Sequence, residues 1–259
     1  MFKNILLGAA LAAGAVSASH AMIIDTFSEA PQFVQVFGPE ARTGADKVRT
    51  ALDNAALPGG AAGTAKGSII GGYRDLKTSL HFAPSVDRKT TAAIDTDTGT
   101  FVHSQDARVE SNSYITWNGL AGAGLGSADL TDGGIHDLFH LVILYADLGA
   151  RWSLQVFDSG GSFTHIFDNT EEITSREDIY IPFSLFTGID MTDVQKIVFG
   201  ANILNTPNLD TELDFLGTTS IPEPASMAVM GAGLMGLGAM ISRRRDVRRG
   251  RVFSGAENA

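Results

Sequence analysis

Residues 152–168 read WSLQVFDSGGSFTHIFD, and this stretch sets the pattern that decides the fold. Two β-prone runs, 152–158 and 163–168, flank the turn residues Ser159-Gly160-Gly161. Runs of this length between glycine-rich turns are typical of strands rather than helices. The stretch therefore predicts two consecutive strands.

The same pattern recurs through most of the chain. Further turn residues stand at Asp97-Thr98-Gly99, Asn118-Gly119 and Asp132-Gly133-Gly134. Strands are expected at 22–27, 33–37, 68–75, 79–82, 90–95, 100–104, 113–117, 137–146, 152–158, 163–168, 178–182, 195–202 and 211–216. Many short strands at this spacing indicate an all-β fold, and we expect one jelly-roll-like β-sandwich domain over residues 22–217.

Two stretches depart from this pattern. Residues 39–66 are rich in Ala, Gly and Thr and predict a long excursion between strands, with one or two helical turns at 47–56. Residues 183–186 predict a short helical turn, after which Asp190 or Thr192 provides a local cap.

The N-terminus has the three parts of a secretory signal peptide. Lys3 precedes an apolar stretch at residues 5–16, and Ser17-Ala18-Ser19-His20-Ala21 offers a small-x-small cleavage site. We expect cleavage after Ala21, with cleavage after Ala18 as the alternative. Residues 1–21 are therefore expected to be removed on export.

The C-terminus combines a proline pair, an apolar run and an arginine cluster. Pro222-Glu223-Pro224 is followed by the apolar residues 225–241 and then by Arg243-Arg244-Arg245. As an α-helix the 17-residue run extends roughly 25 Å, just short of the hydrocarbon core of a bilayer. The arginines stay on the cytoplasmic side under the positive-inside rule. The sequence therefore predicts a linker at 218–224, a transmembrane helix at 225–241 and a basic cytoplasmic tail at 242–259.

This order of parts resembles the PEP-CTERM protein-sorting signal of Gram-negative bacteria. In that family the tripeptide is the recognition and processing site of exosortase, a membrane-embedded transpeptidase, and the bacteria form biofilms and make exopolysaccharide. The resemblance implies that Pro222-Glu223-Pro224 is the sorting motif and that Arg243-Arg244-Arg245 is the stop signal. It also implies export across the inner membrane, transient anchoring there, and delivery to the cell envelope, cell surface or extracellular matrix. A plain C-terminal anchor is the alternative.

Charge and cysteine content narrow the choice of partners. Excluding Lys3 and six tail arginines from the 19 Lys+Arg, and Glu223, Asp246 and Glu257 from the 29 Asp+Glu, leaves 12 basic and 26 acidic residues, a net charge of −14. This balance disfavours nucleic acid and anionic lipid as partners and is compatible with neutral glycans or divalent cations. The chain has no cysteine, so no disulfide stabilises the exported domain.

Three short stretches resemble the galactose-binding-like jelly rolls of carbohydrate-binding modules. They are Ile24-Asp25-Thr26-Phe27, Pro182-Phe183-Ser184-Leu185-Phe186 and Leu213-Asp214-Phe215. A structural calcium ion often lies near the first and last strands of that family. The resemblance therefore implies Asp25 and Asp214 as candidate calcium ligands, with two surface carboxylates as the alternative, and we expect no other cofactor.

A glycan-binding site needs flat aromatic rings beside hydrogen-bonding side chains. Tyr73, Arg74 and Trp117 are the candidate glycan contacts, with Trp152 as a further aromatic residue. Gly71-Gly72 before Tyr73 permits a bulge or a close backbone approach. Aromatic residues of a sandwich also pack in its core, and Arg74 is equally consistent with a buried partner of a carboxylate.

The histidines at 136 and 140 come nearest to a metalloprotease motif. In His136-Asp137-Leu138-Phe139-His140 the two histidines are four residues apart, but zinc proteases need Glu after the first histidine and a helix that presents both. Residues 141–145 favour a strand. We therefore expect ordinary histidines on a strand rather than a zinc site.

Two other patterns match motifs in their letters only. Residues 231–236 fit G-x-G-x-x-G but lack the strand, helix and acidic residue of a dinucleotide-binding unit. Asp95, Asp97, Gly99 and Asp106 suggest a calcium loop, but Thr100 stands where an EF-hand requires glycine. A hairpin turn is the expected structure there.

The sequence lacks a nucleophile elbow and a P-loop, so we expect no enzyme. The leading hypothesis is a non-catalytic protein of the cell envelope or extracellular matrix, with exosortase as its processing partner and exopolysaccharide as its candidate ligand. One alternative is a carbohydrate-active enzyme of sandwich fold, a glycosidase or lyase. The other is a structural surface protein without a ligand.

Overall fold

The computed structural model describes residues 22–38, 49–56, 69–169 and 171–220. The chain divides after Ser220 into two compact units, and every described residue belongs to the first. The expected signal peptide, Pro-Glu-Pro motif, transmembrane helix and basic tail lie outside the described residues. Within the described ranges, no helix is long and apolar enough to cross a bilayer.

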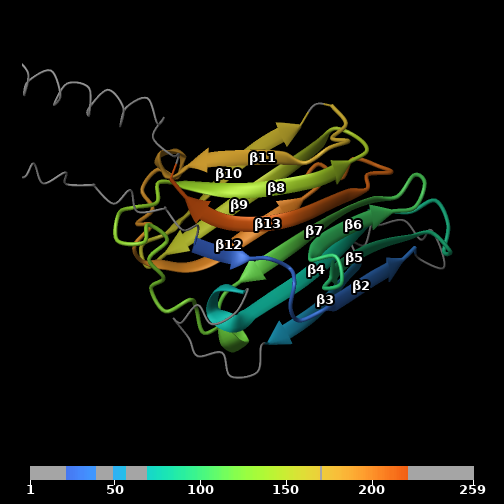
Figure 1. The fold of residues 1–259 in the computed structure, drawn as a ribbon. Helices are drawn as coiled ribbons and strands as arrows, with labels where there is room; N and C mark the ends of the chain where they lie inside the picture. Colours follow the sequence, from blue (N-terminus) through green and yellow to red (C-terminus); the bar gives the residue numbers. More distant parts are fainter. Residues whose placement is uncertain (1–21, 39–48, 57–68, 170, 221–259) are drawn as a thin grey trace, which may run out of the picture. The chain divides into compact units, whose positions relative to one another are not determined.

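Two antiparallel sheets form the described unit (Figure 1). Sheet A has the strand order β11-β8-β13-β6-β5-β2, with β1 beside β13, and sheet B has the order β10-β9-β12-β7-β4-β3. The strands of sheet A are β1 Met22–Asp25, β2 Gln32–Phe37, β5 Lys89–Asp95, β6 Thr100–Gln105, β8 Leu138–Ala146, β11 Glu177–Pro182 and β13 Thr211–Thr219. Those of sheet B are β3 Arg49–Ala56, β4 Tyr73–Phe82, β7 Glu110–Trp117, β9 Ala150–Asp158, β10 Ser162–Asn169 and β12 Val194–Ala201. Short 3₁₀ helices are η1 Ile70–Gly72, η2 Leu120–Gly122 and η3 Phe183–Leu185.

The expected all-β sandwich is confirmed, with changes at three places. Residues 49–56, where helical turns were expected, form strand β3, because their backbone pairs with β4 from Arg49↔Leu80 to Ala56↔Tyr73. Such non-local pairing overrides local helix preference. Strand β4 runs unbroken where two strands were expected, and β13 continues to Thr219, past the expected domain end at 217. The helical turn expected at 183–186 is present as η3, but no side chain caps it; Asp190 instead accepts the backbone N–H of Thr192 in a separate turn.

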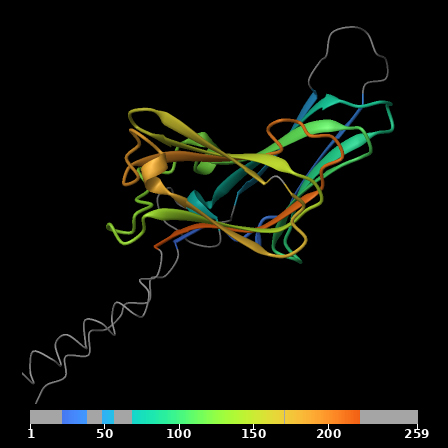
Figure 2. The same ribbon diagram turned by 90° about the horizontal axis from the view of Figure 1, so that it is seen from above.

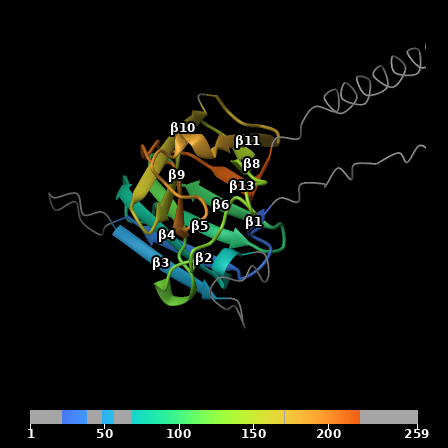
Figure 3. The same cartoon turned by 90° about the vertical axis from the view of Figure 1, so that its left-hand side faces the viewer.

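Alternate side chains of the strands fill the space between the sheets, which form two layers in Figures 2 and 3. The ring of Phe199 stacks on Trp152 with 5.9 Å between centroids and meets the edge of Phe101 at 6.5 Å. The first contact lies within sheet B, between β9 and β12, and the second runs from sheet B to Phe101 on β6 of sheet A, so it helps to hold the layers together. The fully buried side chains of β9 and β12 are Trp152, Leu154, Val156, Val194, Ile197, Phe199 and Ala201.

A buried ion pair also joins the two sheets. The carboxylate of Asp25 on β1 accepts hydrogen bonds from Nη1 of Arg74 on β4 at 2.8 and 2.6 Å. It also accepts the backbone N–H of Phe27 and the indole N–H of Trp117 on β7, each at 2.8 Å. Burial raises the pKa of Asp25, and the charge and hydrogen bonds of Arg74 oppose that rise. Both charged side chains are fully buried.

The remaining donors of Arg74 are satisfied by β2 and the segment before it. Nε donates to Oε1 of Gln32 at 2.7 Å, and Nη2 donates to the carbonyls of Glu29 and Ala30 at 3.0 and 2.8 Å. Each nitrogen of the guanidinium group therefore has a partner. A buried charge is tolerated when it is paired and fully hydrogen-bonded, as it is here. We call this set of contacts the Asp25 network.

A β-bulge turns Asp25 toward the core. Ile23 pairs with Gly217 and Asp25 pairs with Leu216, so Ile24 is the extra residue of the bulge. Ile24 and Asp25 are both fully buried, although strict alternation along a strand sends successive side chains to opposite faces. The bulge therefore makes the Asp25 network possible.

A second buried polar network surrounds His103 on β6. Nδ1 of His103 lies 2.7 Å from Oγ of Ser113, and Nε2 lies 3.1 Å from Nε2 of Gln105. Oε1 of Gln105 accepts the backbone N–H of Leu209, which identifies the other amide atom as the donor. Nε2 of His103 therefore accepts and Nδ1 carries the proton. Burial lowers the pKa of His103 to about 4, so the ring is neutral at physiological pH.

Removing the positive charge of the Asp25 network should destabilise the domain strongly. In the Arg74→Met variant of residues 22–220, Asp25 is buried as an unpaired charge or must take up a proton, and we expect a loss of about 3 to 5 kcal/mol in unfolding free energy. Urea unfolding followed by tryptophan fluorescence measures this loss.

The matched control is Arg151→Met, since Arg151 also binds a carboxylate through two bonds, to Asp168 at 2.6 and 2.9 Å, but at the surface. An exposed pair is screened by water, so the unfolding free energy should hardly change. Equal losses in the two variants would show that the Asp25 network contributes no more to the unfolding free energy than a surface ion pair does.

Acid should weaken the fold through His103. The unfolded chain binds a proton at this side chain near pH 6.5 and the folded chain only near pH 4, so stability is lost as the pH falls between these values. The loss amounts to about 3 kcal/mol from pH 7 to pH 4. Urea unfolding at several pH values should show this slope in the wild type, and His103→Gln should lack that part of it. An identical pH dependence in both proteins contradicts the assignment.

Candidate functional site

The predicted glycan contacts divide between the two faces of sheet B. Arg74 and Trp117 are fully buried in the core, so neither is available to a glycan at the surface, and Trp152 is buried as well. Their alternative interpretation holds: Trp117 and Trp152 are core aromatics, and Arg74 is the partner of Asp25. Tyr73 is half-buried, and burial together with a hydrogen bond to Asp75 raises its pKa. As the neighbour of Arg74 on β4, Tyr73 points to the outer face.

The two predicted calcium ligands, Asp25 and Asp214, bind different partners. Each oxygen of Asp25 already accepts two hydrogen bonds, which leaves no lone pair for a cation. Oδ2 of Asp214 lies 3.6 Å from Nη1 of Arg176 at the surface. In the part of the chain that the structure describes, no group of three or more His, Cys, Asp or Glu side chains is arranged to hold a metal ion. The structure therefore does not bring Asp25 and Asp214 together as calcium ligands.

The two histidines of the 136–140 stretch have separate environments. His136 precedes β8 and is buried, with Nδ1 2.9 Å from the hydroxyl of Thr218. His140 lies within β8 on the outer face of sheet A, where Nε2 is 2.7 Å from Oδ1 of Asp178. The two imidazoles therefore contact different partners, Thr218 and Asp178. The loop after Asp95 is likewise a hairpin turn, in which Oδ1 of Asp95 accepts the backbone N–H of Asp97.

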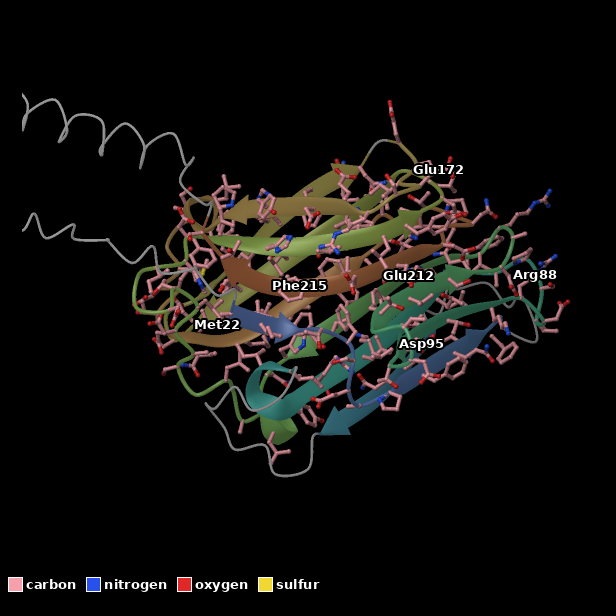
Figure 4. The ribbon with its side chains drawn as sticks, in the orientation of Figure 1. Met22, Arg88, Asp95, Glu172, Glu212 and Phe215 are labelled. Atoms are coloured by element: carbon pink, nitrogen blue, oxygen red, sulfur yellow. The ribbon has the colours of Figure 1, made fainter. Side chains whose placement is uncertain are left out.

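The outer face of sheet A carries a row of aromatic rings on three adjacent strands. Tyr180 on β11 stands opposite His140 on β8, which in turn stands opposite Gly217 on β13. The rings of Tyr180 and His140 stack with 4.7 Å between centroids and 15° between planes. The ring of Phe215 lies 5.4 Å from His140. We call Tyr180, His140 and Phe215 the aromatic patch; Figure 4 shows Phe215 on the face turned to the viewer.

Glycine at 217 makes room for the ring of Phe215. A Cβ atom there would lie 2.4 Å from Cζ of Phe215 and 2.6 Å from the carbonyl oxygen of Met22 on β1. The ring therefore occupies the place of the missing side chain, close to the sheet. The side chain of Tyr180 is 51% exposed.

A β-bulge in β13 places Phe215 outside. Leu213 pairs with Ile143 and Phe215 pairs with Val142, so Asp214 is the extra residue. Leu213 and Leu216 point into the core, whereas Phe215 contacts His140 on the outer face. Bulges re-aim side chains in this way beside binding sites.

Polar groups border the aromatic patch on one side. Arg176 donates from Nη2 and Nε to the two oxygens of Asp178 at 3.2 and 3.3 Å, and its Nη1 lies 3.6 Å from Asp214. Hydrogen bonds from Arg176 and then from His140 lower the pKa of Asp178. We call Arg176, Asp178 and Asp214 the charged rim.

This arrangement suits binding better than acid catalysis. Aromatic faces beside hydrogen-bonding groups offer both apolar contact and orientation to a ligand. A general acid of a glycosidase needs a carboxyl group with a raised pKa, and the pKa of Asp178 is shifted the other way.

Sequence reasoning missed the aromatic patch because it depends on strand register. Tyr180, His140 and Phe215 come from segments about 35 to 40 residues apart that meet only in the sheet. The available signal was the alternation of Asp178, Ile179 and Tyr180 on one strand. The bulge at Asp214 has no signature in the sequence.

The chain has weak structural similarity to several solved carbohydrate-binding modules. A family 11 module of the cellulase Lic26A-Cel5E of Clostridium thermocellum is 10% identical, with 80% of this chain and 99% of that chain covered and a TM-score of 0.36. A family 30 module of the cellulase Cel9D-Cel44B of the same organism is 14% identical, with 74% and 99% covered and a TM-score of 0.36. A family 29 module is 8% identical, with 73% and 89% covered and a TM-score of 0.31. Such values say nothing about the ligand of this chain.

No curated protein sequence matches the chain. At the C-terminus, the family model described as "PEP-CTERM protein-sorting motif" matches residues 220–245, which include the Pro-Glu-Pro tripeptide, the apolar run and the arginine cluster. The resemblance noted from the sequence is therefore confirmed for this segment. The chain carries a PEP-CTERM sorting motif, which implies export, sorting to the cell surface and processing by an exosortase.

Proposed function

We propose that an exosortase processes this protein at Pro222-Glu223-Pro224 and that the sandwich then serves, at the cell envelope or in the extracellular matrix, as a non-catalytic binder of exopolysaccharide. The observation that carries the proposal is the aromatic patch on the outer face of sheet A, in which Tyr180 is exposed and His140 and Phe215 are partly buried. The sorting motif supplies the location, and the patch supplies the binding chemistry.

The chemistry of a sugar ring fits this patch. A pyranose has an apolar face of C–H groups, which packs on an aromatic ring, and a rim of hydroxyl groups, which bond to polar side chains. The rings of Tyr180 and Phe215 provide the apolar contact. His140 and the charged rim lie beside them as hydrogen-bonding groups. The proposed binding surface spans β11, β8 and β13, which is about 10 Å across three strands.

Processing at the sorting motif gives the first prediction. In a Gram-negative host with an exosortase, mass spectrometry of the mature protein should find a C-terminus near Pro222. Glu223→Ala should leave the full-length precursor in the inner membrane, whereas Glu257→Ala, in the tail, should be processed normally. A precursor that matures equally well with Glu223→Ala contradicts the exosortase assignment and favours a plain anchor.

Glycan binding gives the second prediction. The full chain, purified in detergent, should be retarded by neutral polysaccharides in affinity electrophoresis, and Tyr180→Ala combined with Phe215→Ala should abolish the retardation. Because Trp117 and Trp152 are fully buried, binding should leave tryptophan fluorescence unchanged. Tyr73→Ala, on the outer face of sheet B, is the matched control and should bind like the wild type.

The outcomes separate the alternatives. Release of reducing ends from the polysaccharide would indicate a carbohydrate-active enzyme. Loss of binding in Tyr73→Ala alone would move the site to sheet B. A negative result across a glycan array, together with abundance in the matrix, would indicate a structural surface protein without a ligand.

A further inference from the structure

Arg176 stands between two carboxylates at the edge of the aromatic patch. Asp178 on β11 takes the Nε and Nη2 side of its guanidinium group, and Asp214 on β13 lies 3.6 Å from Nη1. The side chain of Arg176 is 56% exposed, so it is at the surface yet already engaged on both sides. This is a different use of arginine from that of Arg74, which is buried.

The contacts with Asp178 and Asp214 limit which ligand groups Arg176 can bind. A free guanidinium group binds a carboxylate through two parallel hydrogen bonds, and this is how proteins commonly hold acidic ligands. Here Asp178 already makes that bidentate contact. Two carboxylates against one guanidinium leave the charged rim with an excess of negative charge. An acidic sugar would have to displace Asp178 and approach Asp214 against like charge.

The position of Asp214 comes from the bulge. Asp214 is the residue of β13 without a partner in β8, directly before Phe215. The same bulge therefore places an aromatic ring in the patch and a carboxylate in its rim. Asp178 is in register with Val142, which is in turn opposite Phe215, so the two carboxylates belong to the same part of the outer face.

We propose that Asp178 and Asp214 are specificity-determining residues that occupy Arg176 and thereby exclude acidic polysaccharides, so that the aromatic patch selects neutral glycans. This inference rests on the proposed function, since it concerns the same surface. Specificity of this kind is achieved by repulsion of the wrong ligand rather than by added attraction to the right one. Neutral hydroxyl groups, in contrast, can donate to the remaining lone pairs of the two carboxylates.

The test is a gain of binding. The full chain in detergent is compared on two cellulose derivatives with the same backbone, the anionic carboxymethyl cellulose and the neutral hydroxyethyl cellulose, at low ionic strength. The wild type should be retarded only slightly by the anionic polymer. The double variant Asp178→Asn and Asp214→Asn frees Arg176, and we expect retardation by carboxymethyl cellulose to increase by about tenfold. Adding Arg176→Gln should remove the gain.

A matched control separates this local effect from net charge. Asp97→Asn with Asp132→Asn changes the net charge by the same amount at two exposed turn positions outside the charged rim, and it should not produce the gain. Thermal unfolding checks that all variants are folded.

Three results would overturn the proposal: no gain in the double variant, an equal gain in the Asp97 and Asp132 control, or a gain that survives Arg176→Gln. Failure of the proposed function has a different signature. In that case neutral polysaccharides are not bound by the wild type, whatever the rim variants do with the anionic polymer.

Discussion

The carboxylate of Asp25 is buried, and the hydrogen bonds that satisfy it connect β1 of sheet A to β4 and β7 of sheet B. Four hydrogen bonds reach it from Arg74 on β4, Trp117 on β7 and the backbone of Phe27, so β1 is fixed to both sheets. Fixing β1 beside β13 brings the carbonyl of Met22 against Gly217, where no side chain fits. The ring of Phe215 fills that space on the outer face. The chain of contacts that begins at a buried charge thus ends at the aromatic patch on the outer face.

Much of the fold could be predicted because it is locally encoded. The β-prone runs and glycine turns around residues 152–168 correctly indicated β9 and β10, and the same reasoning located most other strands. Strand β3 was missed because its pairing with β4 depends on residues far away in the sequence. The position of Phe215 on the outer face was missed for a related reason, whereas a buried partner of a carboxylate was already one of the two expectations for Arg74. Bulges at Ile24 and Asp214 shift the alternation of inward and outward side chains by one residue, and they arise only when the strands pair.

The sorting motif and the proposed binding surface differ in the same way: one is local in the sequence and the other is not. A sorting motif is read as a linear peptide, so Pro222-Glu223-Pro224 and its neighbours could be recognised directly from the sequence. A binding surface on a sheet is assembled from several strands, and Tyr180, His140 and Phe215 have no motif in common. The candidate residues chosen from the sequence, Arg74 and Trp117, have the right chemistry for a sugar, but the fold uses that chemistry to satisfy Asp25.

Hydrogen exchange at the indole N–H of Trp117, followed by NMR, tests this account most directly. If that group donates to the buried carboxylate of Asp25, its exchange should be as slow as that of the most protected amides of β7, with or without a glycan present. Exchange at the rate of an exposed indole, or a shift of the Trp117 signal on addition of a bound polysaccharide, would contradict the account. Either result would indicate that Trp117 is at the surface and contacts the ligand.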